Sequence, residues 1–274
     1  MAADNRRAAA RHSATTGWDP LAKWYDGWVG AGGSIYHRQL AIPAMLELLE
    51  LTRQERVLDI GCGQGVLAPH VAAAGAHYTG VDASAQMIRL ARRRHKSDGR
   101  FLSGDARYLS RMPELQSASF DAVAFMLSIQ DMDPLYAVVD SAAWALTAGG
   151  RLAMLTTHPC FRVPRQSGWG YDPDRRLCYR RVDSYLSGLA VPMKAYRDVD
   201  GAPCQTRTFH RPLQEYVQAL TVQGLVIDRL IEIPATRAES ARDEQTGNTP
   251  SRAERRARRE FPLLLGLRAV RLCR

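Results

Sequence analysis

The chain has 274 residues, of which 46% are hydrophobic and 24% are charged. This balance excludes a largely disordered protein and suits one α/β domain with an insertion. The formal net charge of +9 is compatible with nucleic acid, with an anionic substrate or simply with solubility.

The N-terminal segment and the spacing of cysteines and histidines bear on location and metals. Residues 1–16 are polar and rich in Arg and Ala, which predicts a disordered tail without the apolar core of a signal peptide. Elsewhere no apolar run approaches the about 18 residues of a membrane span, so we expect a cytoplasmic protein that does not enter a membrane. The 5 cysteines and 7 histidines lack paired spacings such as Cys-x-x-Cys, so neither a disulfide framework nor a metal site is predicted.

Residues 17–54 are predicted to form a helical lead-in. A glycine-rich break at 30–33 separates an aromatic segment from a helix near 39–51, whose apolar side chains recur at i, i+3, i+4 and i+7. The aromatic residues of the first segment are Trp18, Trp24, Tyr25 and Trp28. The lead-in is expected to pack on a sheet or to fold over a ligand.

From residue 55 to 157 predicted strands and helices alternate, which indicates a parallel sheet. The predicted strands cover 56–60, 78–81, 101–103, 120–127 and 151–156, and the predicted helices cover 67–74, 84–95 and 134–146. Gly149 and Gly150 are interpreted as the residues that end the third predicted helix.

The alternation stops at residue 158. Residues 158–206 are rich in Pro, Arg and aromatics and are predicted to form a cap of loops and short strands inserted after the fifth strand. Residues 207–274 are expected to complete the sheet with a helix at 212–223 and an antiparallel pair of strands at 226–233 and 264–272. A basic segment, 236–260, lies between these strands. Its part 251–260 favours a helix with a solvated or an anion-contacting face.

A glycine-rich turn follows the first strand. Asp59 precedes Gly61, Gly63 and Gly65, and glycines let the backbone approach a ligand closely. Val66 stands where a dinucleotide fingerprint requires its third glycine, and no Lys-Ser or Lys-Thr follows for a Walker A loop. An acidic residue before the glycines suits a cationic ammonium better than a pyrophosphate. The alternative is that the glycines serve packing alone.

Two further carboxylates follow the next strands. Asp82 ends the second predicted strand, where it can accept hydrogen bonds from both hydroxyls of a ribose, and Asp105 ends the third, where it can accept from an adenine amino group or cap a turn. Because ligands bind at the carboxyl edge of open α/β sheets, the three carboxylates are expected to share one site.

With these residues in order, residues 55–161 resemble the cofactor core of class I S-adenosylmethionine-dependent methyltransferases. The resemblance implies a Rossmann-like sheet of seven mostly parallel strands with the last strand antiparallel, and S-adenosyl-L-methionine as cofactor. The matching positions are Val57 to Gly65, Asp82, Asp105-Ala106, Met126 to Ser128 and the run 146–152. The cofactor contacts that it implies are Tyr25, Asp59, Gly61, Cys62, Gly63, Gly65, Asp82, Ala83, Met87, Asp105, Ala106, Met126 and Leu127.

The acceptor side carries weaker signals. His158 follows the fifth strand and His210 precedes the helix at 212; each is a candidate base or a structural histidine. Their surroundings are similar to a subgroup of small-molecule methyltransferases. The arginines and aromatics of the cap predict recognition of an aromatic or anionic metabolite, with solvated surface charge as the alternative. The expected substrate contacts are Tyr36, His37, Gln130, Arg165 and Trp169.

The sequence therefore predicts a methyltransferase acting on oxygen, nitrogen or carbon of a small molecule, in natural-product or secondary metabolism. A rival interpretation is an RNA or DNA methyltransferase, although the Asn/Asp-Pro-Pro-Tyr/Phe motif of base-amino methylation is missing after the fourth strand. A non-catalytic cofactor-binding protein, and an enzyme that methylates a carbon of a prenyl diphosphate, are also compatible with the sequence. The acceptor and the oligomeric state remain open.

Overall fold

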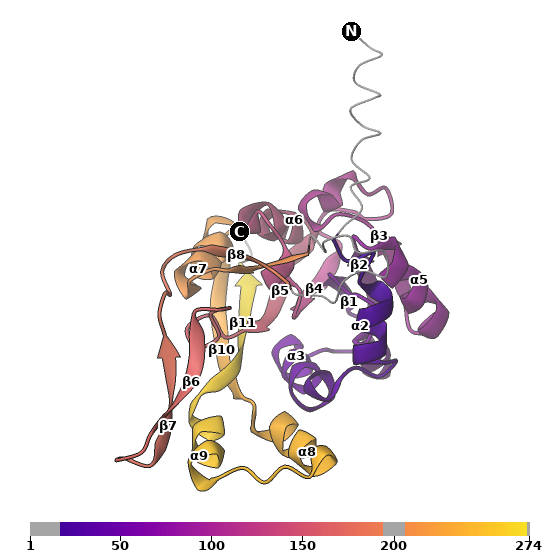
Figure 1. The fold of residues 1–274 in the computed structure, drawn as a ribbon. Coiled ribbons are helices and arrows are strands. Elements are labelled where there is room, and N and C mark those ends of the chain that lie inside the picture. Colours follow the sequence, from indigo (N-terminus) through magenta and orange to yellow (C-terminus); the bar gives the residue numbers. More distant parts are fainter. Residues whose placement is uncertain (1–16, 194–205, 273–274) are drawn as a thin grey trace.

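The computed structural model describes residues 17–193 and 206–272, and the predicted tail at 1–16 lies outside them. A central sheet of seven strands has the order β10-β11-β5-β4-β1-β2-β3 (Figure 1). Its strands are β1 (Arg56–Ile60), β2 (His77–Asp82), β3 (Arg100–Ser103), β4 (Phe120–Met126), β5 (Leu146–Thr157), β10 (Leu225–Pro234) and β11 (Pro262–Arg271).

Six strands of this sheet run in one direction and β11 runs against them. The β1 strand pairs in parallel with both β2 and β4, and β4 pairs in parallel with β5. Between β5 and β10, β11 pairs antiparallel with both, with Leu264 opposite Thr157 and Val226 opposite Val270. The predicted mixed sheet and its antiparallel closing pair are confirmed.

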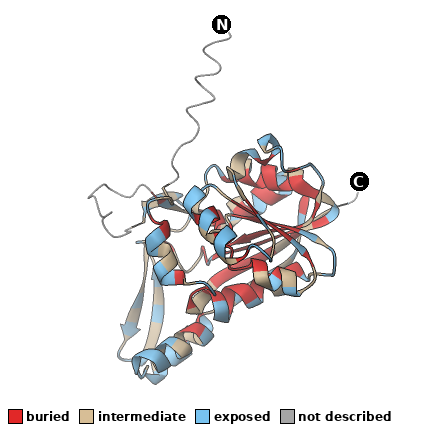
Figure 2. Cartoon of the chain, turned by 90° about the vertical axis from the view of Figure 1, so that its right-hand side faces the viewer, coloured by how far each residue is buried: buried red, intermediate tan, exposed pale blue. Residues whose placement is uncertain are grey.

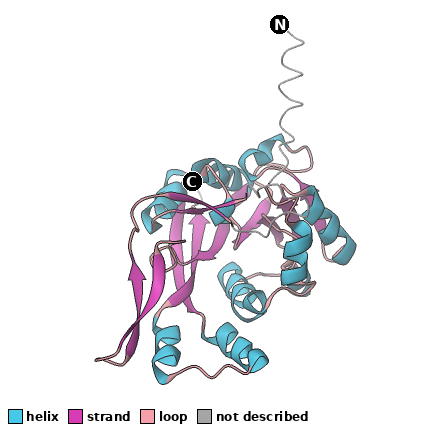
Figure 3. Ribbon diagram, in the orientation of Figure 1, coloured by secondary structure: helices cyan, strands magenta, loops and turns pink. Residues whose placement is uncertain are grey.

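Helices cover both faces of the sheet (Figure 3). On one face of the sheet, Val57 packs in an apolar cluster with residues of α3 (Ile42–Leu49), α4 (Ala68–Ala73) and α5 (Ala85–Arg94). On the other face, Leu58 packs in a second cluster with residues of α6 (Leu135–Ala145) and α7 (Leu213–Val222). Successive residues of a strand face opposite sides. The buried core therefore follows the sheet and the inner faces of the helices (Figure 2).

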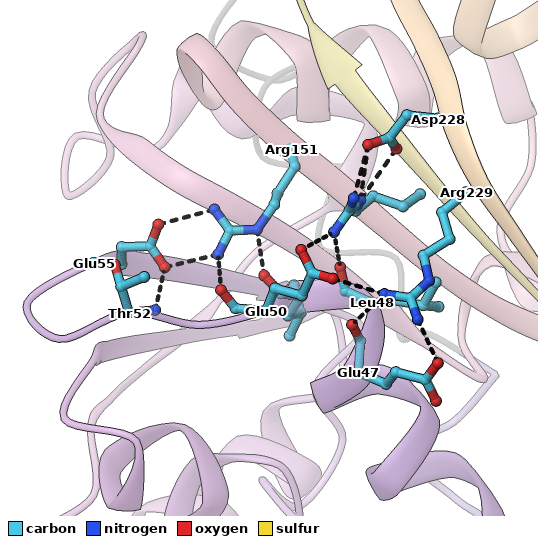
Figure 4. A network of polar contacts seen from close by, with 10 residues as sticks. Glu47, Leu48, Glu50, Thr52, Glu55, Arg151, Asp228 and Arg229 are labelled. Carbon is cyan, nitrogen blue, oxygen red and sulfur yellow. Dashed lines mark hydrogen bonds and ion pairs between the residues drawn. The ribbon is translucent and has the colours of Figure 1, made fainter.

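The lead-in contains α2 (Ala22–Val29), a short π-helical turn, η1 (His37–Ala41), and α3. Three arginines from the sheet donate to the last carbonyl groups of α3 (Figure 4): Arg229 to Glu47 O, Arg268 to Leu48 O, and Arg151 to Leu49 O and Glu50 O. The same arginines form ion pairs with Glu47, Glu50, Glu55 and Asp228. Positive side chains at the C-terminal end of a helix bind carbonyl groups that have no partner within the helix, and they also complement the helix dipole. These three arginines therefore hold α3 against β5, β10 and β11.

One predicted boundary is wrong. Helix α6 ends at Ala145, and β5 begins at Leu146, opposite Phe120. A register shift follows, because Ala122 lies opposite Arg151. Gly149, with φ of +75°, therefore lies inside an irregular strand rather than after a helix. A left-handed glycine serves a β-bulge as well as a helix end, so the dipeptide alone could not distinguish them.

The described part of the cap consists mainly of one β-hairpin and one strand of a second antiparallel pair, and residues 194–205 of the predicted insertion lie outside the described residues. One sheet pairs β6 (Ser167–Asp172) with β7 (Leu177–Val182), and another pairs β8 (Leu189–Pro192) with β9 (Arg207–His210). The β6–β7 hairpin projects from the main sheet at the lower left of Figure 1.

Two helices connect β10 to β11: α8 (Thr236–Thr246) and α9 (Arg252–Glu260). The α9 helix agrees with the helix predicted in the basic segment and begins with a capping box between Ser251 and Glu254. The α8 helix was not predicted, because its sequence has no apolar stripe and only Ala238 is buried. Within residues 17–193 and 206–272, no helix combines the length and the apolar character that crossing a membrane requires.

Candidate functional site

The turn between β1 and α4 contains two glycines that close packing requires and one that has open space beside it. Gly61, Gly63 and Gly65 have φ of +74°, +56° and +84°, a region that glycine adopts without strain. A Cβ on Gly61 would lie 2.6 Å from Ser128 Cβ, and one on Gly65 would lie 2.7 Å from the Phe101 ring. A Cβ on Gly63 would meet no atom within 4 Å. Gly63 therefore leaves its backbone accessible to a ligand, whereas Gly61 and Gly65 are required by packing.

Asp82, at the carboxyl end of β2, holds this turn in place. Its Oδ2 accepts from Gly63 N at 2.8 Å and its Oδ1 accepts from Ser84 N at 2.8 Å. Burial raises the pKa of Asp82, and the two amide hydrogen bonds oppose that rise. Each carboxylate oxygen can accept a second hydrogen bond. The side chain is therefore suited to a pair of adjacent hydroxyl groups, as in a ribose.

Asp59 is buried and only partly satisfied. Its side chain is 1% exposed, and its Oδ2 accepts from Tyr78 OH at 2.7 Å. Its Oδ1 is buried and has no hydrogen-bond partner within the described ranges. Burial raises the pKa of this carboxyl to about 7. A buried acceptor without a donor is costly, and a cationic ammonium is the kind of group that satisfies it. The fit is the one expected for the amino-acid end of S-adenosylmethionine.

The lead-in is anchored to α5 at two points. Asp19 Oδ1 accepts from the hydroxyl of Ser84 at 2.5 Å and from Gln86 N at 3.1 Å, at the N-terminus of α5. Asp26 on α2 forms a two-point ion pair with Arg94 in the last turn of α5, with Oδ2 at 2.9 Å from Nη2. These contacts place α2 beside the end of β2.

The lead-in also reaches the glycine turn directly. The side-chain amide of Gln64 donates to Gly30 O in the glycine-rich break, and Gln64 is 1% exposed. Burial together with the nearby carboxylates Asp131 and Asp82 raises the pKa of Tyr25 above its usual range. Tyr25 is thus close enough to the end of β2 and to the segment after β4 for their carboxylates to influence it, and its contact with the cofactor stays a prediction.

The other expected cofactor contacts are distributed around this edge. Cys62 and Met87 are buried, Met126 is 9% exposed, and Ala106 is half-buried. Ala83 is exposed beside Asp82. Burial, followed by the charges of Asp82 and Asp59, raises the pKa of the Cys62 thiol, so it remains protonated.

Asp105 is engaged by its own neighbour. It caps a 3-10 segment, η2 (Ala106–Arg111), by accepting from Arg107 N at 2.9 Å, and its carboxylate also pairs with the Arg107 guanidinium at 2.6 Å. The turn-capping interpretation of Asp105 is therefore present in the structure, and contact with an adenine stays a prediction.

Backbone strain marks the segment after β4. Leu127 has φ of +57°, and its N–H donates to Leu155 O at 2.9 Å. A leucine whose backbone adopts the left-handed conformation is uncommon, and backbone strain of this kind concentrates at functional sites. The Gln130 amide is held by the protein, because it donates to Leu127 O at 2.6 Å and accepts from Thr156 Oγ1 at 3.0 Å. Gln130 therefore shapes this wall, and direct contact with a substrate stays a prediction.

Asp131 is a candidate functional residue that the sequence reasoning missed. It ends the short 3-10 segment η3 (Ile129–Asp131) that follows β4. Burial raises its pKa to about 7, while a hydrogen bond from Thr208 and the charge of Arg211 oppose the rise. The available signal was an acidic residue just after the fourth strand, at the edge already assigned to the ligand.

Both candidate histidines have protein partners. His158, 2% exposed, has Nε2 at 2.8 Å from Glu232 Oε1, and its Nδ1 accepts from Cys160 N at 3.2 Å. Burial lowers its pKa despite Glu232. His210 is 5% exposed and donates through Nε2 to Tyr185 O at 2.7 Å. These contacts favour the structural interpretation that the sequence left open for each.

The four remaining substrate candidates lie in two groups. His37 is 4% exposed, its Nδ1 lies 2.8 Å from Ser34 Oγ, and burial lowers its pKa to about 4. Tyr36 is half-buried and packs against the core beside it. Arg165 is exposed and donates to Pro192 O at 3.2 Å, whereas Trp169 lies against two other arginines of the cap.

The amino edge of the sheet lacks the chemistry of this site. A hollow at the opposite, amino edge of the sheet is lined by residues including Arg56, His77 and Gly99, and by none of the three carboxylates of the site. Within residues 17–193 and 206–272, no group of three or more His, Cys, Asp or Glu is placed to hold a metal ion.

Comparison with known proteins follows this geometry. A family model described as a methyltransferase domain matches residues 57–150. A ubiquinone biosynthesis O-methyltransferase of Idiomarina loihiensis is 33% identical over 182 residues, or 66% of each chain. A malonyl-[acyl-carrier protein] O-methyltransferase of Enterobacter lignolyticus is 36% identical over 152 residues, or 53% of this chain and 58% of the relative. The matches therefore span somewhat less than two thirds of these relatives.

Solved structures share the fold. An S-adenosylmethionine-dependent methyltransferase from Mesorhizobium loti superposes with a TM-score of 0.65 at 23% identity, covering 88% of this chain and 100% of its own. A geranyl diphosphate C-methyltransferase from Streptomyces coelicolor, solved with S-adenosyl-L-homocysteine, superposes with a TM-score of 0.54 at 16% identity, covering 84% of this chain and 75% of its own.

Proposed function

The chain belongs to the class I S-adenosylmethionine-dependent methyltransferases, and we propose that it transfers the methyl group of this cofactor to a small-molecule acceptor. The observation that carries the proposal is the carboxyl edge of the sheet. There Asp59, with an oxygen that has no partner in the described chain, and Asp82, whose two oxygens can both accept, lie at the ends of β1 and β2, and the open face of Gly63 follows β1.

Each of these residues has a distinct role toward the cofactor. Asp59 receives the ammonium on its free oxygen, Asp82 receives the ribose hydroxyls, and the Gly63 backbone lies against the ligand. Asp105 and Ala106 form the adenine side of the site. The bound cofactor supplies an electrophilic methyl group on a sulfonium sulfur. The protein aligns the acceptor with that methyl group, an effect that can supply roughly 7–11 kcal/mol.

On the acceptor side, Asp131 is the proposed general base. It lies just after β4, near Tyr25 of the lead-in, and its pKa of about 7 lets it take a proton at neutral pH. His158 and His210 are held by Glu232 and Tyr185. Asp131 would take the proton of an acceptor hydroxyl. The bound cofactor would supply the methyl group to the acceptor oxygen and would leave as S-adenosylhomocysteine, which keeps the electron pair of the broken methyl–sulfur bond. The relatives named as O-methyltransferases support an oxygen acceptor.

The setting of the reaction is also proposed. We place the acceptor among small metabolites, including those of secondary metabolism. Transfer to a prenyl diphosphate carbon is a second candidate, favoured by the arginine-rich cap and by the structural likeness to the geranyl diphosphate enzyme.

The test begins with the cofactor and then the base. S-adenosylhomocysteine is expected to bind the full chain in calorimetry, and labelled S-adenosylmethionine is expected to label a small molecule from a panel of phenols, carboxylic acids and prenyl diphosphates. Asp131→Asn should lower the rate at least about 100-fold and remove a pH-rate limb near 7, with unchanged S-adenosylhomocysteine affinity.

The matched control is Asp133→Asn, which changes an exposed carboxylate of the same loop that pairs with Arg211. It should keep the pH profile of the wild type. A wild type that binds no S-adenosylhomocysteine contradicts the proposed function. Labelling of RNA rather than any small molecule selects a nucleic-acid acceptor, and a normal pH profile in Asp131→Asn rejects Asp131 as the base.

A further inference from the structure

We propose that Arg162 and Arg180, together with Trp169, form a binding site for an oxyanion group, a carboxylate or a phosphate, carried by the acceptor. The inference rests on the proposed function and adds a substrate class to it. The site lies just beyond β5, at the edge of the sheet that carries the cofactor residues, because Arg162 N donates to His158 O at 2.8 Å.

Arg162 carries a charge that the protein does not balance. Its Nε is buried and has no hydrogen-bond partner, and the guanidinium forms no ion pair within the described parts of the chain. The carboxylate of Glu239 favours the charged form of Arg162 through space. It does not form an ion pair with Arg162, because it pairs with Arg258 at 2.7 Å. Burial accordingly lowers the pKa of Arg162. A desolvated, unpaired guanidinium is costly unless an anion accompanies it.

A second cation lies beside the first. Arg180 donates to Phe161 O at 2.7 Å and to Ser167 Oγ at 2.8 Å, which are neutral acceptors. Burial and then the charge of Arg162 lower the pKa of Arg180. Within residues 17–193 and 206–272, neither guanidinium contacts a carboxylate, so the pair concentrates positive charge.

Trp169 organises the two cations. It is paired with Arg180 across the β6–β7 hairpin, and its ring lies 5.2 Å from the Arg180 guanidinium and 5.6 Å from that of Arg162. The edge of Phe261 contacts the same ring, with centroids 5.4 Å apart. Stacking on an aromatic ring fixes a guanidinium while leaving its N–H groups free to donate. The arrangement therefore leaves the N–H groups of Arg162, and those of Arg180 that Phe161 and Ser167 do not bind, to donate to a ligand.

Arg258 shows what a structural arginine looks like in this molecule. Its guanidinium pairs with Glu239 and with Asp243, which joins α9 to α8. Arg162 has no such carboxylates. The sequence had selected Arg165, but that side chain is exposed and donates to the carbonyl of Pro192.

The test compares Arg162→Met with Arg181→Met in the full chain saturated with S-adenosylhomocysteine, because Arg181 is an exposed arginine of the same hairpin that already pairs with Asp183. The probes are 4-hydroxybenzoate for a carboxylate and inorganic pyrophosphate for a phosphate, with sodium chloride holding ionic strength constant. At least one probe should bind the wild type and raise its Tm. Arg162→Met should bind that probe at least about tenfold more weakly, and Arg181→Met should match the wild type. The affinity for S-adenosylhomocysteine should be equal in all three proteins.

A second readout separates binding from a structural role. Without a probe, Arg162→Met should have a higher Tm than the wild type, because it keeps the apolar stem and removes a partly buried charge that no ion pair balances. A lower Tm, or wild-type probe affinity in Arg162→Met, overturns the proposal, as does the failure of both probes to bind the wild type. Arg162→Lys, which keeps the charge but loses the planar fork, should weaken the probe with little change in Tm. Failure of S-adenosylhomocysteine to bind would instead contradict the proposed function.

Discussion

Asp82 and Asp59 lie on neighbouring strands and are held in opposite ways. Both Asp82 oxygens accept from backbone amides, so the carboxylate positions the glycine turn while keeping lone pairs for a ligand. Asp59 has one hydroxyl donor and one oxygen without a donor in the described chain. The first residue is therefore preorganised, whereas the second is completed only when a cation binds.

Removing the Asp82 carboxylate should release both partners. Asp82→Ala leaves Gly63 N and Ser84 N without their acceptors and removes the proposed ribose contact, so S-adenosylhomocysteine affinity should fall by about 2–3 kcal/mol, or roughly 30–150-fold. Calorimetry measures this directly.

Asp121 provides the matched control for Asp82. It also accepts from a backbone amide, Arg56 N at 2.7 Å, but at the amino edge of the sheet. Asp121→Ala should lower the Tm without changing S-adenosylhomocysteine affinity. Equal losses of affinity in the two variants would show that Asp82 acts only through stability.

Among the elements, the lead-in depends on contacts between distant residues. Asp19 and Asp26 bind the two ends of α5, and Gln64 binds the Gly30 carbonyl. Three arginines of the sheet hold the end of α3. The helix that precedes the sheet in sequence is thus oriented by residues that follow it.

Breaking the Asp26–Arg94 pair should loosen α2. Asp26→Arg and Arg94→Asp, each alone, place like charges together and should weaken S-adenosylhomocysteine binding by about threefold to tenfold, with faster proteolysis in the lead-in. The double variant restores opposite charges and should recover most of the affinity.

This cycle also has a clear negative outcome. If each single variant keeps the wild-type affinity and proteolysis pattern, the ion pair does not hold the lead-in in its binding position. If both single variants lose affinity and the double variant recovers none of it, the loss comes from the altered side chains themselves.

The sequence predicted the alternating core well, because strand and helix periods are local. It placed β1 at its observed bounds and anticipated β11 as an antiparallel partner of β10. It missed α8, which buries almost no apolar side chain. It also misplaced the start of β5, because the glycines at the irregularity in this strand have the same sequence pattern as a helix end.

For the site, the glycine turn and Asp82 were recognisable as a motif. Asp131 and Arg162 were not, because the desolvation of Asp131 and the lack of an ion-pair partner for Arg162 among the described residues are tertiary properties. Neither property leaves a pattern along the chain. For the same reason the sequence could not show that His158 and His210 are occupied by Glu232 and Tyr185.

At the scale of the whole molecule, buried acids make stability depend on pH. The pKa of Asp131 is about 7 in the folded protein and about 3.9 in an unfolded chain. As pH rises from 4 to 7 the unfolded chain releases this proton while the folded chain retains it, so stability is lost across that window. His37, whose pKa is lowered to about 4, acts in the opposite direction, because stability rises as pH passes from its folded to its unfolded value.

The contribution of Asp131 to the pH dependence of stability is therefore measured as the difference in unfolding free energy between Asp131→Asn and the wild type. Asp131→Asn should gain stability relative to the wild type as pH rises from 4 to 7, by roughly 1–3 kcal/mol in total, and the difference should then level off. Urea unfolding at unit intervals from pH 4 to 8 measures it. A difference that is constant across this range would place the folded pKa of Asp131 near its ordinary value.

The position of β11 has a consequence for synthesis of the chain. This strand is the last of the described elements, yet it lies inside the sheet between β5 and β10. Until residue 271 has left the ribosome, β5 and β10 each present an unpaired strand edge, and such edges invite association with other chains. The nascent protein therefore completes its sheet only when β11 is inserted, and a chain that stopped before Pro262 would leave the edges of β5 and β10 that face β11 open at once.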